Sequence, residues 1–319
     1  MKTIVNTNMN KKIAGTISIF IIGIFIAYIV FDVATGKSDR NDANEAPIES
    51  EELVTNWQIT NELPVTDGKL QAVSLAFNDN IICGGDSFLS LYDSSYDQLW
   101  TINTPSALTA LAAYGDTIYA ATTETVLLYD TSGKLIDEWG PYDDEAIITS
   151  IAASRNYIAL ADAGNKLVFI LDRKGALESI AGYPADPFII PSPYFDVWLT
   201  GDDVLVVANT GERQIEFRTL EGRVIRAIGE EGDELKYFCG CCNPSHFTIT
   251  PGGKIITAEK GINRIKVLDQ DGRLIEPLAS PAFFRPSSPL DIVAAGENLI
   301  YAANSENSIL YTFRRTDKK

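Results

Sequence analysis

The chain has 319 residues, 45% of them hydrophobic, with 43 acidic and 26 basic residues, for a formal net charge of −17, and one histidine. This length and apolar content predict a substantial buried core and exclude a largely disordered chain. The acidity would repel phosphate backbones, and since no basic run offsets it, we expect no nucleic-acid binding. A single histidine also excludes a zinc site built from two or three imidazoles of one chain.

The N-terminal 53 residues are expected to lie outside the folded domain. Residues 13–31 are uncharged and apolar, and at about 1.5 Å per residue they would reach roughly 28 Å, enough to span a bilayer. The basic residues of segment 1–12 predict that this end stays in the cytoplasm. Residues 32–53 then form a polar, flexible linker to an extracytoplasmic domain, in the periplasm or at the cell surface. The alternative is a cleaved signal peptide.

Residues 54–315 contain six copies of one four-stranded unit of short apolar strands and tight turns, followed by a tail at 316–319. The first strands recur at spacings of 36, 40, 46, 50 and 45 residues, which are typical of propeller blades. Their anchor residues are Leu75, Leu111, Ile151, Val197, Phe247 and Ile292. In four units the third strand is followed by a turn ending in glycine, at 133, 175, 222 and 272, where a hairpin needs positive φ.

The sixth unit runs out after three strands, and the missing strand is found at the other end of the repeats. The segment NWQIT at 56–60 matches the fourth strand LWTIN at 99–103, with Trp57 over Trp100. An N-terminal strand that completes the last blade would close the ring and remove its exposed sheet edges. The sequence therefore predicts an all-β, six-bladed β-propeller behind a single N-terminal transmembrane helix.

Two stretches carry a family resemblance. Residues 247–278 (FTITPGGKIITAEKGINRIKVLDQDGRLIEPL) resemble an NHL repeat, and residues 204–229 resemble it as well. This resemblance implies an NHL-like or TolB-like propeller, a class that includes protein-binding platforms, RNA-binding modules, sensors and lyases, so the fold alone does not give the function. The run GCCNPSHF followed by TAEKGINRIKV is similar to an uncharacterised bacterial NHL-type group with a G-C-C-N-P signature, which implies redox partners.

The long loops are expected on one face of the ring. Loops between the second and third strands, and between successive blades, lie at the same end of such a ring. All three long insertions are of this kind, at 181–195, 229–247 and 279–289. Long loops on a rigid scaffold are where binding sites usually occur. We therefore expect the functional surface on this face.

Three of the four cysteines and the only histidine lie within eight residues of the second long loop. In an oxidising compartment the thiols could form a disulfide, including one between the adjacent Cys241 and Cys242. Three thiolates and an imidazole are also ligand types for a transition metal, and an exchange-active thiol is a third reading. Cys83 is expected to be a small core residue. The candidate binding residues are Cys239, Cys241, Cys242, Asn243, His246, Glu259 and Lys260, of which Cys239, Cys241, Cys242 and His246 are the candidate metal ligands.

A second candidate site is a ring of oxygens at the mouth of the channel, one from the end of each second strand. Such oxygens could hold Ca²⁺, or each could accept hydrogen bonds from its own following turn. The residues are Asp86, Thr122, Asp162, Asn209, Glu259 and Asn304.

Three functions remain open from the sequence. The first is a membrane-anchored, exported propeller that serves as a protein-interaction or electron-transfer accessory module, partnered by another envelope protein, a redox protein among them. The second is a calcium-dependent hydrolase or lyase at the channel mouth, where the general base would be a carboxylate or His246. The third is a structural or sensory ectodomain. The scarcity of histidine favours a non-enzymatic role.

Overall fold

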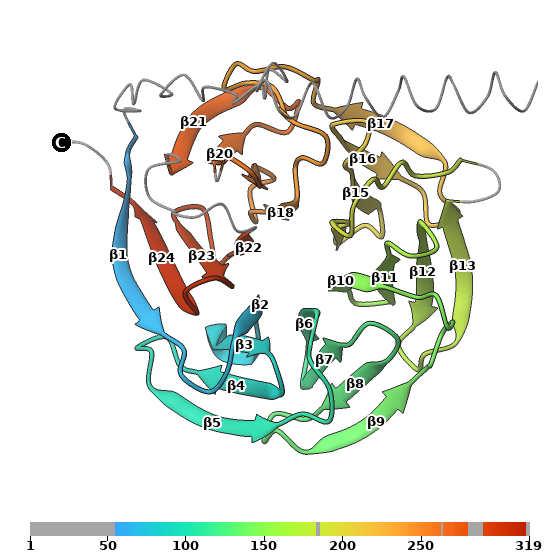
Figure 1. Ribbon diagram of the computed structural model, residues 1–319, viewed down its shortest axis with the longest axis vertical. Coiled ribbons are helices and arrows are strands. Elements are labelled where there is room, and N and C mark those ends of the chain that lie inside the picture. Colours follow the sequence, from blue (N-terminus) through green and yellow to red (C-terminus); the bar gives the residue numbers. More distant parts are fainter. Residues whose placement is uncertain (1–54, 183–185, 263, 280–289, 317–319) are drawn as a thin grey trace, which may run out of the picture. The chain divides into compact units, whose positions relative to one another are not determined.

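The computed structural model describes residues 55–182, 186–262, 264–279 and 290–316, and the statements below concern these ranges. They form six four-stranded antiparallel sheets arranged around a central channel (Figure 1). This confirms the predicted six-bladed β-propeller. Within the described ranges no helix is long and apolar enough to cross a membrane. The expected anchor at 13–31 and linker at 32–53 lie outside these ranges.

Each blade takes its strands in chain order from the channel outward. The first blade contains β2 (Leu70–Leu75), β3 (Ile81–Gly85), β4 (Phe88–Tyr92) and β5 (Gln98–Asn103), with a short 3-10 turn at Phe77–Asp79. The second contains β6 (Ala110–Tyr114), β7 (Thr117–Ala121), β8 (Val126–Tyr129) and β9 (Leu135–Trp139). The third contains β10 (Ile148–Ala153), β11 (Tyr157–Asp162), β12 (Leu167–Asp172) and β13 (Leu177–Gly182).

The remaining blades follow the same order. The fourth contains β14 (Val197–Leu199), β15 (Leu205–Asn209), β16 (Gln214–Arg218) and β17 (Val224–Ile228). The fifth contains β18 (His246–Ile249), β19 (Ile255–Glu259), β20 (Arg264–Leu268) and β21 (Leu274–Ala279). The sixth contains β22 (Leu290–Ala294), β23 (Leu299–Asn304), β24 (Ile309–Arg315) and, from the other end of the repeats, β1 (Trp57–Pro64).

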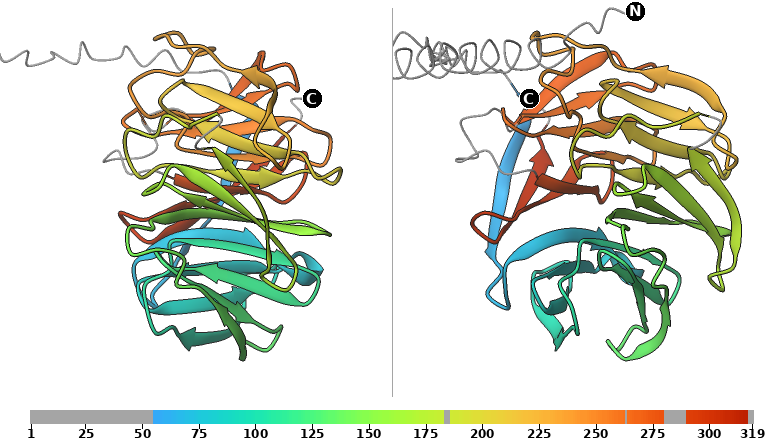
Figure 2. Two further views of the ribbon diagram at one scale, coloured as in Figure 1. Left: turned by 90° about the vertical axis from the view of Figure 1, so that its right-hand side faces the viewer. Right: turned by 45° about the vertical axis from the view of Figure 1, so that its right-hand side comes forward.

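The ring is closed by the N-terminal strand, as predicted. β1 pairs antiparallel with β24 from Trp57 opposite Arg315 to Pro64 opposite Ile309, and Figure 2 shows the blue β1 beside the red strands of the last blade. Trp57 is buried and its indole Nε1 donates to Oε1 of Glu276 at 3.1 Å. Because Glu276 belongs to β21 of the fifth blade, the closing strand also ties two blades together.

The turns and the core follow the sequence pattern. The glycines at 133, 175, 222 and 272 all have positive φ, between 81° and 90°, as the predicted hairpin turns require. Cys83 is fully buried in the apolar core, which confirms its expected place.

The register of the first strand in the first blade differs from expectation. In the first blade the counterpart of Leu111, Ile151 and Val197 is Val73 on β2, two residues before Leu75, and β2 carries a bulge between Leu70 and Ala72.

Candidate functional site

The cysteine loop is held in place by the side chain of Asn243. Its Oδ1 accepts the backbone N–H of Lys260 at 2.9 Å. Its Nδ2 donates to the backbone oxygens of Cys239 at 2.8 Å and Lys260 at 3.1 Å. Asn243 is buried, so its amide replaces the water that these backbone groups would otherwise bind. The loop is therefore fixed to the end of β19 by one side chain.

Cys241 and Cys242 form a close but unequal pair of thiols. All four cysteines of the chain are free, and the Sγ atoms of Cys241 and Cys242 lie 3.1 Å apart. Cys241 is exposed, whereas Cys242 is only 2% exposed. The hydrogen bond from Cys242 lowers the pKa of Cys241, while burial raises the pKa of Cys242. A thiolate is the reactive form of a cysteine, and of the two thiols Cys241 is the exposed one with the lowered pKa.

Two cations favour the thiolate of Cys241. Lys260 and Arg213 both lower its pKa, after the contribution of the Cys242 hydrogen bond. Nε of Arg213 donates to the backbone oxygen of Gly240 at 3.0 Å, and its Nη2 lies 3.2 Å from Oε1 of Glu231. Lys260, predicted as a binding residue, lies close enough to act on Cys241, whereas Arg213, on the turn before β16, was not identified from the sequence. Lys236, which precedes the cysteines, pairs instead with Glu234.

Lys260 also connects the cysteine loop to the mouth of the channel. Nζ of Lys260 lies 3.4 Å from Oγ of Ser192 and 4.2 Å from the centre of the Tyr194 ring. The Ser192 hydroxyl also hydrogen-bonds Cys242 and lowers its pKa. A cavity lies at the mouth of the channel, and Tyr194 and His246 both line this mouth cavity. The first and second long loops thus meet at the thiol pair, as expected for loops displayed on one face.

A buried charge network supports the loop from below. The carboxylate of Glu259 binds Arg264 at 2.8 Å and Lys266 at 3.1 Å, and all three side chains are almost wholly buried. Arg264 and Lys266 also donate to backbone oxygens of the loop at Tyr237, and Lys266 to that of Leu235. Burial lowers the pKa of Lys266 to about 8. Glu259, proposed as a binding residue, therefore holds the loop and does not face the channel.

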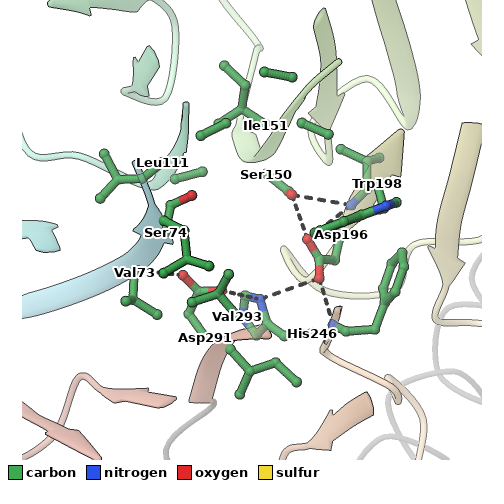
Figure 3. A pocket seen from close by; sticks show the side chains of 18 of the residues that line it. Val73, Ser74, Leu111, Ser150, Ile151, Asp196, Trp198, His246, Asp291 and Val293 are labelled. Atoms are coloured by element: carbon green, nitrogen blue, oxygen red, sulfur yellow. Dashed lines mark hydrogen bonds and ion pairs between the residues drawn. The ribbon is translucent and has the colours of Figure 1, made fainter. Parts of the chain in front are cut away.

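His246 lies apart from the cysteines and faces the central channel. Its Nδ1 is 3.5 Å from Oδ1 of Asp291 and 3.9 Å from Oδ2 of Asp196 (Figure 3). Asp196 accepts the hydroxyl of Ser150 at 2.5 Å and the backbone N–H of Phe247 at 2.7 Å. These four side chains come from four successive blades. They form a continuous polar arc on the channel wall.

The carboxylates of this arc sit in an environment that disfavours their charge. Burial raises the pKa of Asp291 to about 6, with His246 opposing the shift and Asp196 adding to it. Burial likewise raises the pKa of Asp196, against the lowering effect of His246 and of its hydrogen bonds. Perturbed acids of this kind gather at functional sites more often than elsewhere. The arc is therefore a second candidate site.

The arc occupies equivalent positions of the repeat. Each of its residues is directly followed by a first-strand anchor, and the backbone opposite it on the second strand belongs to a small residue. The six positions are Ala72, Ala110, Ser150, Asp196, His246 and Asp291, opposite Gly84, Ala121, Ala161, Ala208, Ala258 and Ala303. The sequence analysis overlooked Ser150, Asp196 and Asp291. The signal was present, because two aspartates and the histidine directly precede anchors in the aligned repeats.

The expected ring of oxygens is not assembled as a calcium site. Oδ1 of Asp162 accepts three backbone N–H groups, from Ile147, Gly164 and Asn165. Oδ1 of Asn304 accepts from the N–H of Glu306, and Oγ1 of Thr122 from the turn that follows it. Asn209 is bound to Ile189 and Glu216. Asp162, Asn304 and Thr122 thus bond to their own following turns, as the alternative predicted, whereas Asn209 and Glu259 bond elsewhere. Of the expected ring, only Asp86 lines the mouth cavity.

The expected four-ligand metal set is not brought together either. His246 contacts Asp196 and Asp291, whereas Cys239 and Asn243 face the end of β19. In the described part of the chain no group of three or more His, Cys, Asp or Glu side chains is arranged to hold a metal ion. The physical reason is that His246 is the first residue of β18. Its pairing with Ala258 on β19 fixes its position at the channel.

Comparison with known proteins defines the class of fold. No protein-family model and no curated protein matches the chain. Among solved structures, virginiamycin B lyase from Staphylococcus aureus is 12% identical, covers 81% of this chain and 99% of its own, and gives a TM-score of 0.53. The Cps50 (Swd1) propeller domain of Myceliophteria thermophila is 14% identical, with coverages of 82% and 100% and a TM-score of 0.57.

A protein of unknown function from Bacteroides caccae is 13% identical, with coverages of 72% and 88% and a TM-score of 0.56. At such identities the likeness shows the fold alone. The chain is thus a β-propeller, a fold consistent with a protein-interaction module, and its NHL-repeat membership remains a prediction.

Proposed function

We propose that this propeller is an exported interaction module that exchanges electrons with partner proteins through the thiol pair Cys241 and Cys242. The observation that carries the proposal is the 3.1 Å separation of one exposed and one buried sulfur. The exposed thiol is the one whose pKa is lowered. An accessible, low-pKa thiol beside a second cysteine is the arrangement used in thiol–disulfide exchange.

The reaction balances with a partner disulfide as the oxidant. The thiolate of Cys241 attacks one sulfur of that disulfide, and the other partner sulfur leaves as a thiolate and takes up a proton. Cys242 then loses its proton and attacks Sγ of Cys241, which forms the Cys241–Cys242 disulfide and releases the second partner thiol. Two electrons and two protons pass to the partner. In reverse, the oxidised loop accepts them from a partner dithiol.

The test uses oxidised glutathione as the probe and peptide mapping by mass spectrometry as the measurement. We expect the full chain to lose two hydrogens and to yield a peptide with Cys241 joined to Cys242. Cys242→Ser should instead accumulate glutathione on Cys241, and Cys241→Ser should do neither. Cys239→Ser is the matched control and should behave as the parent chain. A bond from Cys239 to either neighbour, or a loop that stays reduced, would contradict the proposal.

The proposed place of the module is the outer side of a membrane, tethered by residues 13–31 and 32–53. The partner would then be another envelope protein that carries a redox centre. The acidic propeller disfavours nucleic acid as a partner. A membrane-impermeant maleimide tests this arrangement: intact cells should label Cys241, whereas Cys241→Ser should abolish most of the signal. Labelling that requires lysis would place the thiol pair on the other side.

A second candidate function, proton-transfer catalysis at the channel mouth, is favoured by the contact of His246 with two carboxylates. A histidine-to-alanine variant of the solved virginiamycin B lyase is described as catalytically inactive, and that protein shares this fold. A calcium-dependent version is not supported, because the expected oxygen ring serves nearby loops. Hydrolysis of a panel of esters and lactones, measured for the parent chain and for His246→Gln, tests this second function. Turnover that is unaffected by His246→Gln would exclude His246 as the base.

A further inference from the structure

The six equivalent positions on the wall of the central channel change from polar and charged side chains to alanine around the ring. Of the six equivalent positions, the third to sixth blades contribute Ser150, Asp196, His246 and Asp291, while the first two contribute only alanine. Together the first strands enclose a cavity of about 220 Å³, which opens into a mouth cavity of about 460 Å³. The lining of the inner cavity therefore offers both carboxylates and apolar side chains to a compound with one charged and one apolar end.

The two carboxylates of the arc have no lysine or arginine partner in the described cavity lining, and His246 is their one titratable neighbour there. Asp196 and Asp291 line the cavity, and no lysine or arginine is among the described residues that line it or its mouth. The fixed donors to these carboxylates are neutral: the Ser150 hydroxyl and the N–H groups of Val73, Val197 and Phe247. Buried carboxylates are normally paired with a cation. The imidazole of His246 is the single titratable neighbour, at 3.5 Å and 3.9 Å.

The remaining walls favour an organic cation. Trp198 lines the inner cavity beside Asp196 (Figure 3) while its side chain also packs against the neighbouring apolar core, and an indole near a carboxylate can add to the binding of an ammonium group. Leu111, Ile151 and Val293 supply apolar surface in the same cavity. A cavity of about 150 Å³ lined by apolar side chains holds benzene, so this one has room for an aromatic ring with a short side chain.

We propose that the channel binds a small organic ammonium ion, with the ammonium group on the channel side of Asp196, His246 and Asp291 and the apolar body against the apolar side chains of the inner cavity. A bare metal ion fits less well, because the described residues hold no group of three ligating side chains. The binding is independent of the thiol pair, since no cysteine lines either cavity among the described residues. This site is therefore additional to the proposed thiol exchange.

The experiment compares 2-phenylethylamine with its neutral analogue 2-phenylethanol, which has nearly the same shape. Binding to the full chain is measured by isothermal titration calorimetry at pH 7.5, with tryptophan fluorescence as a second readout. We expect the amine to bind at least about tenfold more tightly than the alcohol, as one desolvated charge pair implies. Trp198→Phe should remove the fluorescence change. Equal affinity for the two compounds would overturn the proposal.

Variants locate the binding to the arc. Asp291→Asn should weaken the amine at least about tenfold and leave the alcohol unchanged, because only the charge is lost. Asp233→Asn, in the cysteine loop, is the matched control and should have no effect. Should Asp291→Asn fail to fold, Ala113→Leu narrows the same cavity without touching a carboxylate and should reduce the binding of both compounds. Amine binding that survives both variants, or calcium binding in place of the amine, would refute the site.

Discussion

The amide of Asn243 holds the backbone of Lys260 from both sides, accepting its N–H at 2.9 Å and binding its carbonyl oxygen at 3.1 Å. This clamp fixes the cysteine loop and the lysine that neighbours its thiols in one arrangement. Asn243→Ala would leave three backbone groups without their partner, at a cost of about 1–3 kcal/mol each at most in unfolding free energy. We expect lower stability and faster alkylation of the buried Cys242. Asn156→Ala, which removes an exposed hydrogen bond, serves as the control in both measurements.

Lys260 is expected to set the reactivity of the exposed thiol. Its charge lowers the pKa of Cys241, so Lys260→Met should raise that pKa and slow alkylation by iodoacetamide at pH 7. The rate is measured as a function of pH, by mass spectrometry of the Cys241 peptide. Lys236→Met is the matched control, because Lys236 pairs with Glu234. A pH profile that is the same in Lys260→Met and the parent chain would show that the lysine acts only on the loop's position.

Asp291 should make the protein more stable at mildly acidic pH. Its pKa is raised to about 6 by burial, whereas an unfolded aspartate titrates near pH 3.9. Between these values the folded chain binds more protons than the unfolded chain, so the free energy of unfolding from this group falls as pH rises through the window. Asp291→Asn should flatten that dependence in urea titrations from pH 4 to pH 7. Asp130→Asn is the control: its carboxyl has a lowered pKa, so it titrates mostly below pH 4 and its removal should leave the slope in this window nearly unchanged.

In the buried charge network beneath the loop, removing the acid should cost more stability than removing one of the two bases. Glu259→Gln leaves the buried Arg264 and Lys266 without their carboxylate, and we expect a loss of about 3–5 kcal/mol. Lys266→Met should cost less, because Glu259 keeps Arg264. Chemical denaturation measures both. Lys254→Met, which breaks the more exposed pair with Glu297, should cost no more than about 1 kcal/mol, and equal losses in all three variants would contradict this assignment.

The closing strand should contribute strongly to stability through Trp57. This side chain is buried, and its indole binds Glu276 of the neighbouring blade, so Trp57→Ala should cost about 3–5 kcal/mol. Trp100→Ala is the comparison, since Trp100 is only partly buried in the fourth strand of the first blade. The two losses are read from thermal unfolding. A smaller loss at Trp57 than at Trp100 would show that closure by β1 is a minor part of the fold's stability.

Much of this molecule follows from local patterns in the chain. Strand periodicity and the glycines at 133, 175, 222 and 272 gave the blades, because hairpins depend on residues close in sequence. The similarity of Trp57 and Trp100 gave the closing strand. The cysteine loop was recognised because three of the four cysteines and the only histidine lie within eight residues. Lys260 was among the predicted binding residues.

The tertiary structure alone decided which side chains meet. Ser150, Asp196, His246 and Asp291 are 46, 50 and 45 residues apart in the chain, and they form one arc only because the ring closes on itself. The pairing of His246 in β18 separates it from the cysteines, and the packing of the long loops brings Ser192 to Cys242. Each repeat specifies a blade through short-range hydrogen bonds. Contacts between blades depend instead on the angle at which the six sheets pack, and no single repeat determines that angle.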